Sequence, residues 1–151
     1  MTPEYKIPQS VLVVIYTPVL DVLLLERADH PGYWQSVTGS RAAADEPLVV
    51  TCAREVAEET GRLEAAERFE EWNLTHRYAI YPQWRHRYAP GVIENTEHVF
   101  GLLVAERWDP RLAADEHTAY RWLPWRAAAD ACFSWTNAQA IRTLTQRCAE
   151  P

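Results

Sequence analysis

No run of about 18 consecutive apolar residues, the length that crosses a bilayer as a helix, occurs in the sequence. The N-terminus also lacks the charged start and apolar core of a secretion signal. Both absences disfavour membrane-spanning and exported proteins. We therefore expect a soluble, cytoplasmic protein with no membrane partner.

Basic runs and cysteine clusters are missing as well. The formal net charge is −6 and no Lys/Arg run occurs, so we expect no nucleic-acid partner. Three cysteines are present, and no CxxC or Cys/His pair has the spacing of a metal site. An odd, sparse set of this kind predicts reduced thiols that pack inside helices.

What the chain does contain is a large apolar fraction in a modest length. Hydrophobic residues make up 48% of 151 residues, and seven of them are Trp, which is enough for a folded core. No repeat, low-complexity tract or linker divides the sequence. We therefore expect a single domain over residues 1–151.

Apolar runs alternate with turn signals along the chain, which predicts a regular order of elements. We expect strands at Val11–Tyr16, Val22–Leu25, Trp34–Thr38, Phe69–Ile80, Gln83–Tyr88, Thr96–Ala105 and Tyr120–Leu123. We expect helices at about Glu46–Thr60, at Pro124–Cys132 and at Thr136–Arg147, the last opened by a capping box of Thr136 and Gln139. This order predicts an α/β fold, an α/β/α sandwich around a mixed sheet.

The first helix would carry an acidic face. Because each helical residue advances roughly 100°, Glu55, Glu58 and Glu59 fall at i, i+3 and i+4 on one side. Like charges so placed repel each other by a few tenths of a kcal/mol per pair. A cation among them would relieve this, and Mg²⁺ takes carboxylates together with substrate phosphates. The alternative is a solvated acidic face.

The stretch from Gly39 to Arg62 resembles the signature of the Nudix hydrolase family, G-x5-E-x7-R-E-U-x-E-E-x-G-U, where U is aliphatic. Gly39, Glu46 and the run Arg54–Gly61 occupy its fixed positions. Two departures occur: six residues rather than five separate Gly39 from Glu46, and Arg62 replaces the last aliphatic residue. They put the loop geometry in question, but not the acidic helix face.

Further blocks are similar to one branch of this family, the enzymes that act on dihydroneopterin triphosphate. They follow in the same order at Tyr5–Pro8, Ser10–Tyr16, Tyr33–Ser40, Arg85–Val92, Asn95–Glu97, Glu116–Leu123 and Ser134–Ile141. The resemblance implies a Nudix-type α/β/α sandwich with a central mixed sheet. It also implies a Mg²⁺-dependent pyrophosphohydrolase of folate biosynthesis that converts this small-molecule triphosphate to the monophosphate and pyrophosphate.

The resemblance also implies the metal-binding and catalytic residues. Glu55, Glu59 and Glu116 would bind Mg²⁺, or Mn²⁺ as a substitute, with Glu58 as a further ligand. Arg54 would brace a helix glutamate, and Glu46 would pair with Arg54. Glu116 is our candidate for the base that activates water, and without the resemblance it would be interpreted as a surface carboxylate.

Substrate-binding positions follow from the same blocks. They are Lys6, Arg27, Thr38, Tyr78, Ile80, Tyr81 and Ser134. For Lys6 and Arg27 the alternative is a solvated cation. Arg85 and Arg87 share one face of their predicted strand, and they would either attract phosphates or belong to an exposed strand. We expect Trp34 and Trp135 in the core, and we assign no role to His30, His76, His98 and His117.

Two other functions remain open at this point. The first is hydrolysis of a nucleoside triphosphate or another nucleoside diphosphate derivative, because the signature reads phosphates and metal rather than the rest of the substrate. The second is a catalytically silent ligand-binding module, for which the altered loop between Gly39 and Glu46 is the support.

Overall fold

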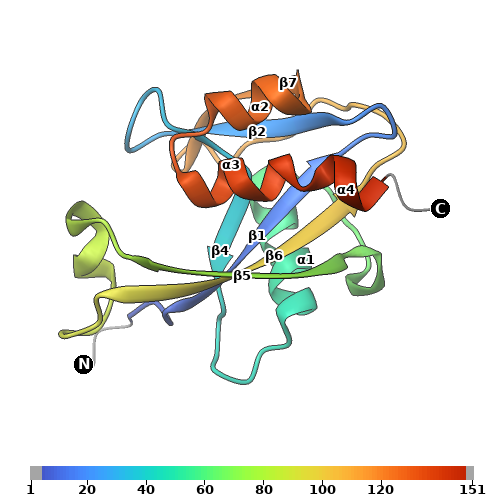
Figure 1. Cartoon of the computed structure of the whole chain (residues 1–151). Helices are drawn as coiled ribbons and strands as arrows, with labels where there is room; N and C mark the ends of the chain where they lie inside the picture. Colours follow the sequence, from blue (N-terminus) through green and yellow to red (C-terminus); the bar gives the residue numbers. More distant parts are fainter. Residues whose placement is uncertain (1–4, 149–151) are drawn as a thin grey trace.

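A seven-stranded mixed sheet forms the centre of the protein in the computed structural model, which describes residues 5–148 (Figure 1). The strands are β1 (Gln9–Tyr16), β2 (Asp21–Arg27), β3 (Trp34–Gln35), β4 (Val37–Ser40), β5 (Glu70–Ala79), β6 (Glu94–Leu103) and β7 (His117–Pro124). The helices are α1 (Leu48–Thr60), α2 (Trp125–Ala131), α3 (Trp135–Arg142) and α4 (Leu144–Cys148), with short 3₁₀ helices η1 (Ala66–Arg68) and η2 (Pro82–Arg87).

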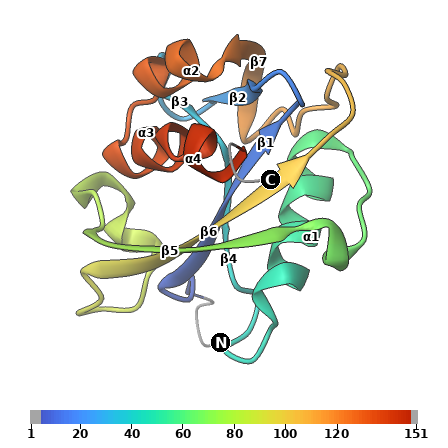
Figure 2. The same cartoon turned by 45° about the vertical axis from the view of Figure 1, so that its right-hand side comes forward.

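Helices cover both faces of this sheet. Successive side chains of β1 point to opposite faces, so its continuous apolar run is buried twice. Val11 and Val13 belong to a core cluster with Val56 of α1, and Leu12 belongs to a second cluster with Ile141 of α3. Figures 1 and 2 show α1 on one side and α2, α3 and α4 on the other. The predicted α/β/α sandwich is therefore confirmed.

Strand β1 is the point at which the sheet divides. Along one edge it pairs in parallel with β6 over its whole length. Along the other edge β4 pairs with residues Ser10–Val13, whereas β2 pairs only through Tyr16 and Val22. Strand β2 then carries β3 and β7. Strands β1 and β2 thus pair at one residue pair, and β4 and β2 diverge beyond it.

Two local predictions are wrong. The expected strand Gln83–Tyr88 is the helix η2, which begins at Pro82, so Arg85 and Arg87 do not share a strand face. The expected capping box at Thr136 is absent from α3. The N-cap is Ser134, whose hydroxyl accepts a hydrogen bond from the Asn137 backbone N–H at 3.2 Å.

The C-terminal helix is also divided, because a break at Thr143 separates α3 from α4. The Thr143 hydroxyl donates to the Ala140 carbonyl at 2.8 Å, a local bond that competes with helix continuation.

Burial raises the pKa of the thiols of Cys52 and Cys132, which supports packing rather than chemistry. The side chain of Cys148 lies outside the described part.

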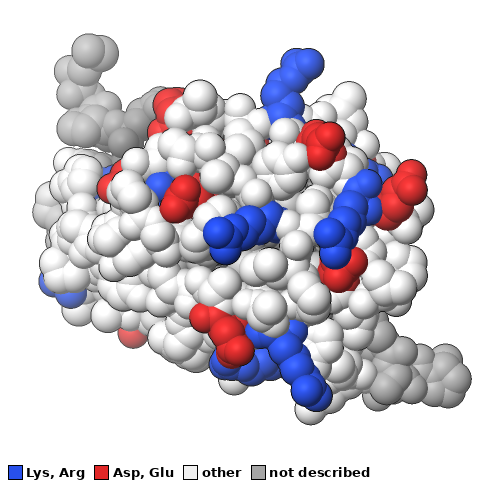
Figure 3. Space-filling model, turned by 90° about the horizontal axis from the view of Figure 1, so that it is seen from above, with Lys and Arg blue, Asp and Glu red and all other residues white. Residues whose placement is uncertain are grey.

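Within residues 5–148, no helix has both the length and the apolar character needed to cross a membrane. Acidic and basic side chains are interspersed over the face seen from above in Figure 3. On that face neither sign of charge forms a continuous area.

Gly101 of β6 provides a test of the packing on the α3 side of the sheet. A Cβ at this position would lie 2.4 Å from the Trp72 ring, so Gly101→Ala should lower the free energy of unfolding by about 1–3 kcal/mol. Urea unfolding measures this. Adding Gly101→Ala to Trp72→Leu should have a smaller effect, because the clashing ring is gone. An equal loss in both backgrounds would contradict this account.

Candidate active site

A cavity of about 880 Å³ opens where β1, β4, β5 and β6 meet α1, η2 and the start of α3. Its lining includes every site residue predicted from the sequence: Lys6, Arg27, Thr38, Arg54, Glu55, Glu58, Glu59, Tyr78, Ile80, Tyr81, Glu116 and Ser134. These residues span nearly the whole chain, and the fold brings them to one place.

Arg54 ties the altered loop to α1. Its guanidinium contacts Glu46 Oε1 at 2.9 Å and Glu55 Oε1 at 2.7 Å, and it donates to the Ser40 carbonyl at 3.0 Å. The predicted pairing of Arg54 with Glu46 is therefore confirmed. The Ala42 backbone N–H also donates to Glu46 at 3.0 Å, so the loop stays attached despite its extra residue.

Hydrogen bonding from Arg54 lowers the pKa of Glu46 to about 2, from an ordinary value of 4.5. Glu46 is therefore ionised at neutral pH and serves as the fixed end of this contact. The guanidinium of Arg54, held from the loop side by Glu46, reaches Glu55 on α1. This arrangement fixes one acidic side chain at the cavity wall.

Gly39 lets the helix approach the strand. A Cβ at Gly39 would lie 2.0 Å from the carboxyl carbon of Glu55, so no larger residue fits while Glu55 keeps its place. Burial at this contact raises the pKa of Glu55. The glycine at the start of the signature therefore has a packing reason here, independent of loop conformation.

Glu59 is the most deeply buried of the helix carboxylates. Its side chain is 1% exposed, and neither carboxylate oxygen has a hydrogen-bond partner among the described residues. Burial, reinforced by the charge of Glu55, raises its pKa well above the usual range. A solvated acidic face is therefore wrong for Glu59. It fits only Glu58, whose side chain is 54% exposed.

Glu59, Glu116 and His117 form a cluster in which one ligand atom from each residue lies within 4.8 Å of the others. His117 Nε2 lies 3.6 Å from Glu59 Oε1, and its buried Nδ1 has no partner within residues 5–148. Burial and the charge of Arg27 lower the pKa of His117 to about 4, so its imidazole is neutral at pH 7.

This donor set fits a divalent cation. A buried carboxylate without a partner is unfavourable unless a positive charge joins it, and a neutral imidazole beside it is a further ligand. Glu55 and Glu58 line the cavity but lie outside the three-residue cluster. His117, to which the sequence analysis assigned no role, belongs to this cluster. Its position directly after Glu116 was the available signal.

One end of the cavity is cationic. Arg27 and Arg87 both reach Asp29, at 2.8 and 3.3 Å, and the Trp84 indole N–H donates to the same carboxylate at 3.1 Å. Arg27 also stacks over the Trp84 ring at 4.2 Å. Asp29, whose pKa falls to about 2 mainly through its bond from Arg27, therefore joins the loop after β2 to η2.

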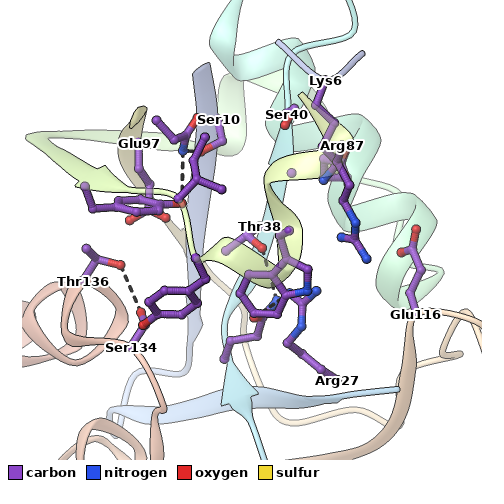
Figure 4. A pocket seen from close by; sticks show the side chains of 18 of the residues that line it. Lys6, Ser10, Arg27, Thr38, Ser40, Arg87, Glu97, Glu116, Ser134 and Thr136 are labelled. Carbon is purple, nitrogen blue, oxygen red and sulfur yellow. Dashed lines mark hydrogen bonds between the residues drawn. The ribbon is translucent and has the colours of Figure 1, made fainter. Parts of the chain in front are cut away.

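The opposite end is polar and aromatic (Figure 4). The Asn95 amide donates to Ser10 Oγ at 2.8 Å and to the Tyr78 hydroxyl at 3.1 Å, and Ser134 bonds Thr136 at 3.1 Å. The prediction that Trp135 lies in the core is wrong, because its side chain is 58% exposed at the cavity.

The remaining predictions for aromatic and histidine residues have mixed outcomes. Trp34 is partly buried against the α3-side core, as expected. His76, to which no role was assigned, packs behind the cavity wall, where its ring centroid lies 5.1 Å from that of Trp135, which lines the cavity. The sequence analysis also missed Asp29, Trp84 and Glu97, all of which line the cavity.

The sandwich and the carboxylate-bearing helix define the class. A family model described as the NUDIX domain matches residues 6–144, and the chain belongs to this family of hydrolases. In particular, the chain is 43% identical over 140 residues to the dihydroneopterin triphosphate diphosphatase of Escherichia coli K12, covering 91% of each. The Haemophilus influenzae protein of the same name is 38% identical over 143 residues, covering 92% of this chain and 88% of that protein.

Solved structures agree with the sequence relatives. The structure of the E. coli dihydroneopterin triphosphate pyrophosphohydrolase superposes with a TM-score of 0.86 at 41% identity, covering 95% of this chain and 98% of that one. A Nudix hydrolase structure from Listeria monocytogenes gives 0.76 at 20% identity, covering 95% of each chain, which shows the fold alone.

The Glu46–Arg54 contact makes a pH-dependent stability prediction. Glu46→Gln should lower the free energy of unfolding at pH 7 by about 1–3 kcal/mol, because it removes a charge-assisted hydrogen bond. Since the folded-state pKa is depressed from 4.5 to about 2, this stabilisation is complete above the unfolded value and disappears as pH falls through that window. Urea unfolding at pH 7, 4 and 2.5 measures the difference.

The matched control is Glu67→Gln in the exposed helix η1. It should change stability little at any of these pH values. A gap between wild type and Glu46→Gln that stays constant down to pH 2.5 would show that the Arg54 contact is not its source.

Proposed function

We propose that the protein hydrolyses dihydroneopterin triphosphate to dihydroneopterin monophosphate and pyrophosphate, a step of folate biosynthesis, in the cytoplasm. The observation that carries this is 43% identity across 91% of the chain to an E. coli enzyme named for that activity. The cavity supplies the chemical means, because cations, buried carboxylates and a polar aromatic end line it together. We also propose that residues 1–151 form one catalytic domain.

Mg²⁺, with Mn²⁺ as a substitute, is the proposed cofactor. Glu55, Glu59 and Glu116 would hold it, with Glu58 as a further ligand and His117 within reach of the same site. The buried, unpartnered oxygens of Glu59 support this. When bound, the ion supplies neutralisation of phosphate charge and a lower pKa for a bound water.

The protein's own groups supply the rest. Lys6 and Arg27 would bind phosphate oxygens, and Arg54 would keep Glu55 in place through the contact to Glu46. Water attacks phosphorus, the anhydride bond breaks, and pyrophosphate leaves. Glu116, exposed at the cavity mouth, is the candidate that accepts the proton of that water.

Substrate positioning would fall to the remaining residues. Thr38, Tyr78, Ile80, Tyr81 and Ser134 all line the same cavity, which supports their assignment to the pterin and its side chain. Tyr78 is fixed by its bond from Asn95, and Ser134 by its bond to Thr136. The bonds of these two side chains orient them before any substrate binds.

Glu59→Gln separates function from stability. Turnover should fall by more than roughly 100-fold, because even partners outside the metal ligands are worth about 10–100-fold. The metal-free variant should melt no lower than wild type, since it loses a buried, unpartnered carboxyl. Adding 10 mM Mg²⁺ should raise the melting temperature of wild type only. Glu106→Gln, at an exposed loop position, is the control. Near wild-type turnover in Glu59→Gln would remove the proposed metal site.

The substrate is tested by a side-by-side panel of dihydroneopterin triphosphate, dATP and ADP-ribose with Mg²⁺. We expect the highest kcat/KM and pyrophosphate release with the pterin. Faster cleavage of a nucleotide would keep the hydrolase and discard the pterin. Mg²⁺-dependent binding without any cleavage would instead identify a binding module.

A further inference from the structure

A second buried carboxylate, Glu97, lies at the end of the cavity that the cations leave free. Its side chain is 2% exposed, and on β6 it stands between Ser10 of β1 and His76 of β5. Figure 4 separates the two ends: Ser10, Glu97, Ser134 and Thr136 lie at one, and Lys6, Arg27, Arg87 and Glu116 at the other.

The hydrogen-bond acceptor sites of Glu97 are only partly occupied. Within residues 5–148 its carboxylate has one hydrogen-bond partner, His76 Nδ1 at 3.3 Å, although a carboxylate offers about four acceptor sites. The His76 ring is fixed from behind, because its Nε2 lies 2.6 Å from Gln139 Oε1. The hydrogen bond to Glu97 raises the pKa of His76.

A buried carboxyl group with free acceptor sites selects what can lie against it. Leaving a carboxylate out of water without donors costs several kcal/mol, so a ligand group at this end must donate hydrogen bonds. Phosphate is excluded by its charge. A flat ring that presents adjacent N–H groups fits, because two parallel N–H donors match one carboxylate.

Aromatic side chains that line the same cavity suit such a ring. Tyr81, Trp84 and Phe133 line the cavity with ring centroids 5.3 to 6.2 Å apart. Aromatic faces of this kind stack on planar heterocycles. A 2-amino-4-oxopyrimidine ring, as in a pterin, carries a ring N–H beside an exocyclic amino group, which is the donor pair that Glu97 lacks.

We propose that Glu97 is a specificity-determining residue, whose carboxylate accepts hydrogen bonds from the ring N–H and the 2-amino group of a 2-amino-4-oxopyrimidine. His76 is a positioning residue that orients this carboxylate. The inference rests on the proposed function. It adds that the end of the cavity that holds Glu97 recognises the ring of the substrate. The competing explanation is a purely structural Glu97–His76 pair.

The test is binding of neopterin, which lacks phosphate, and of its 2,4-dioxo analogue, in which an oxygen replaces the amino group. Both are titrated by fluorescence without metal, so hydrolysis plays no part. Wild type should bind neopterin at least about tenfold more tightly than the analogue, since each bond to a charged group is worth about 1.5–3 kcal/mol. Glu97→Gln should lose at least about tenfold for neopterin and lose or reverse the preference.

Two further variants keep the test sharp. Glu97→Asp retains the charge on a shorter side chain, so it should bind neopterin more weakly yet keep the preference. Glu94→Gln, the same substitution at an exposed position of β6, should behave as wild type. A reversal of preference cannot arise from loss of folding, which weakens both ligands alike.

The outcomes separate the two proposals. If wild type releases pyrophosphate from dihydroneopterin triphosphate and Glu97→Gln matches it in KM and in neopterin affinity, the role of Glu97 is overturned and the proposed function stands. If wild type binds neopterin no better than the analogue, the role of Glu97 is also overturned. If wild type binds neopterin through Glu97 but does not cleave the triphosphate, the proposed function is overturned alone.

Discussion

The burial of Glu59 is the constraint on which the site depends. A carboxyl that is 1% exposed and unpartnered opposes folding, and it stays only because α1 is fixed from several directions. Val56 anchors the helix to the core, the Arg54–Glu46 contact anchors it to the loop, and Gly39 permits the close approach of Glu55. Stability is thus exchanged for a cluster of carboxyl groups held close together at the cavity wall.

The division of the sheet at β1 brings side chains from other strands to the same cavity. One edge of β1 pairs with β4 along Ser10–Val13 and with β2 only at Tyr16. Side chains from β2 and from β4 can therefore both line the cavity. Arg27 arrives from the end of β2 and Thr38 from β4, while Glu97 arrives from β6. The cations and Glu116 therefore lie at one end of the cavity, and Glu97 lies at the other.

Much of this could be predicted from the sequence, because local pattern determines it. The apolar run of β1, the helical spacing of Glu55 and Glu59, and the Glu46–Arg54 pair follow from periodicity and the family signature. The helix η2 could not, because alternation across Gln83–Tyr88 resembles a strand, and its conformation depends on Pro82 and on contacts with Asp29.

The residues that were missed depend on long-range contacts. His117 acquires a possible ligand role only when β7 brings it to Glu59. Trp135 looked like a core residue because it is large and apolar, but the first turn of α3, set by the Ser134 cap, turns it toward the cavity. Glu97 lies in the polar first half of β6, where one sequence shows no sign of the histidine that meets it across the sheet.

Glu97 and Glu59 show why burial alone does not define a carboxylate's role. Glu59 lies among other acids and lacks a donor, so what it requires is a cation. Glu97 already has a hydrogen-bond partner in His76, and what it retains is acceptor capacity. One buried acid therefore suits a metal ion and the other a neutral donor edge. Under the two proposals, that difference in partners, rather than any difference in exposure, would let one small cavity distinguish the two ends of a single substrate.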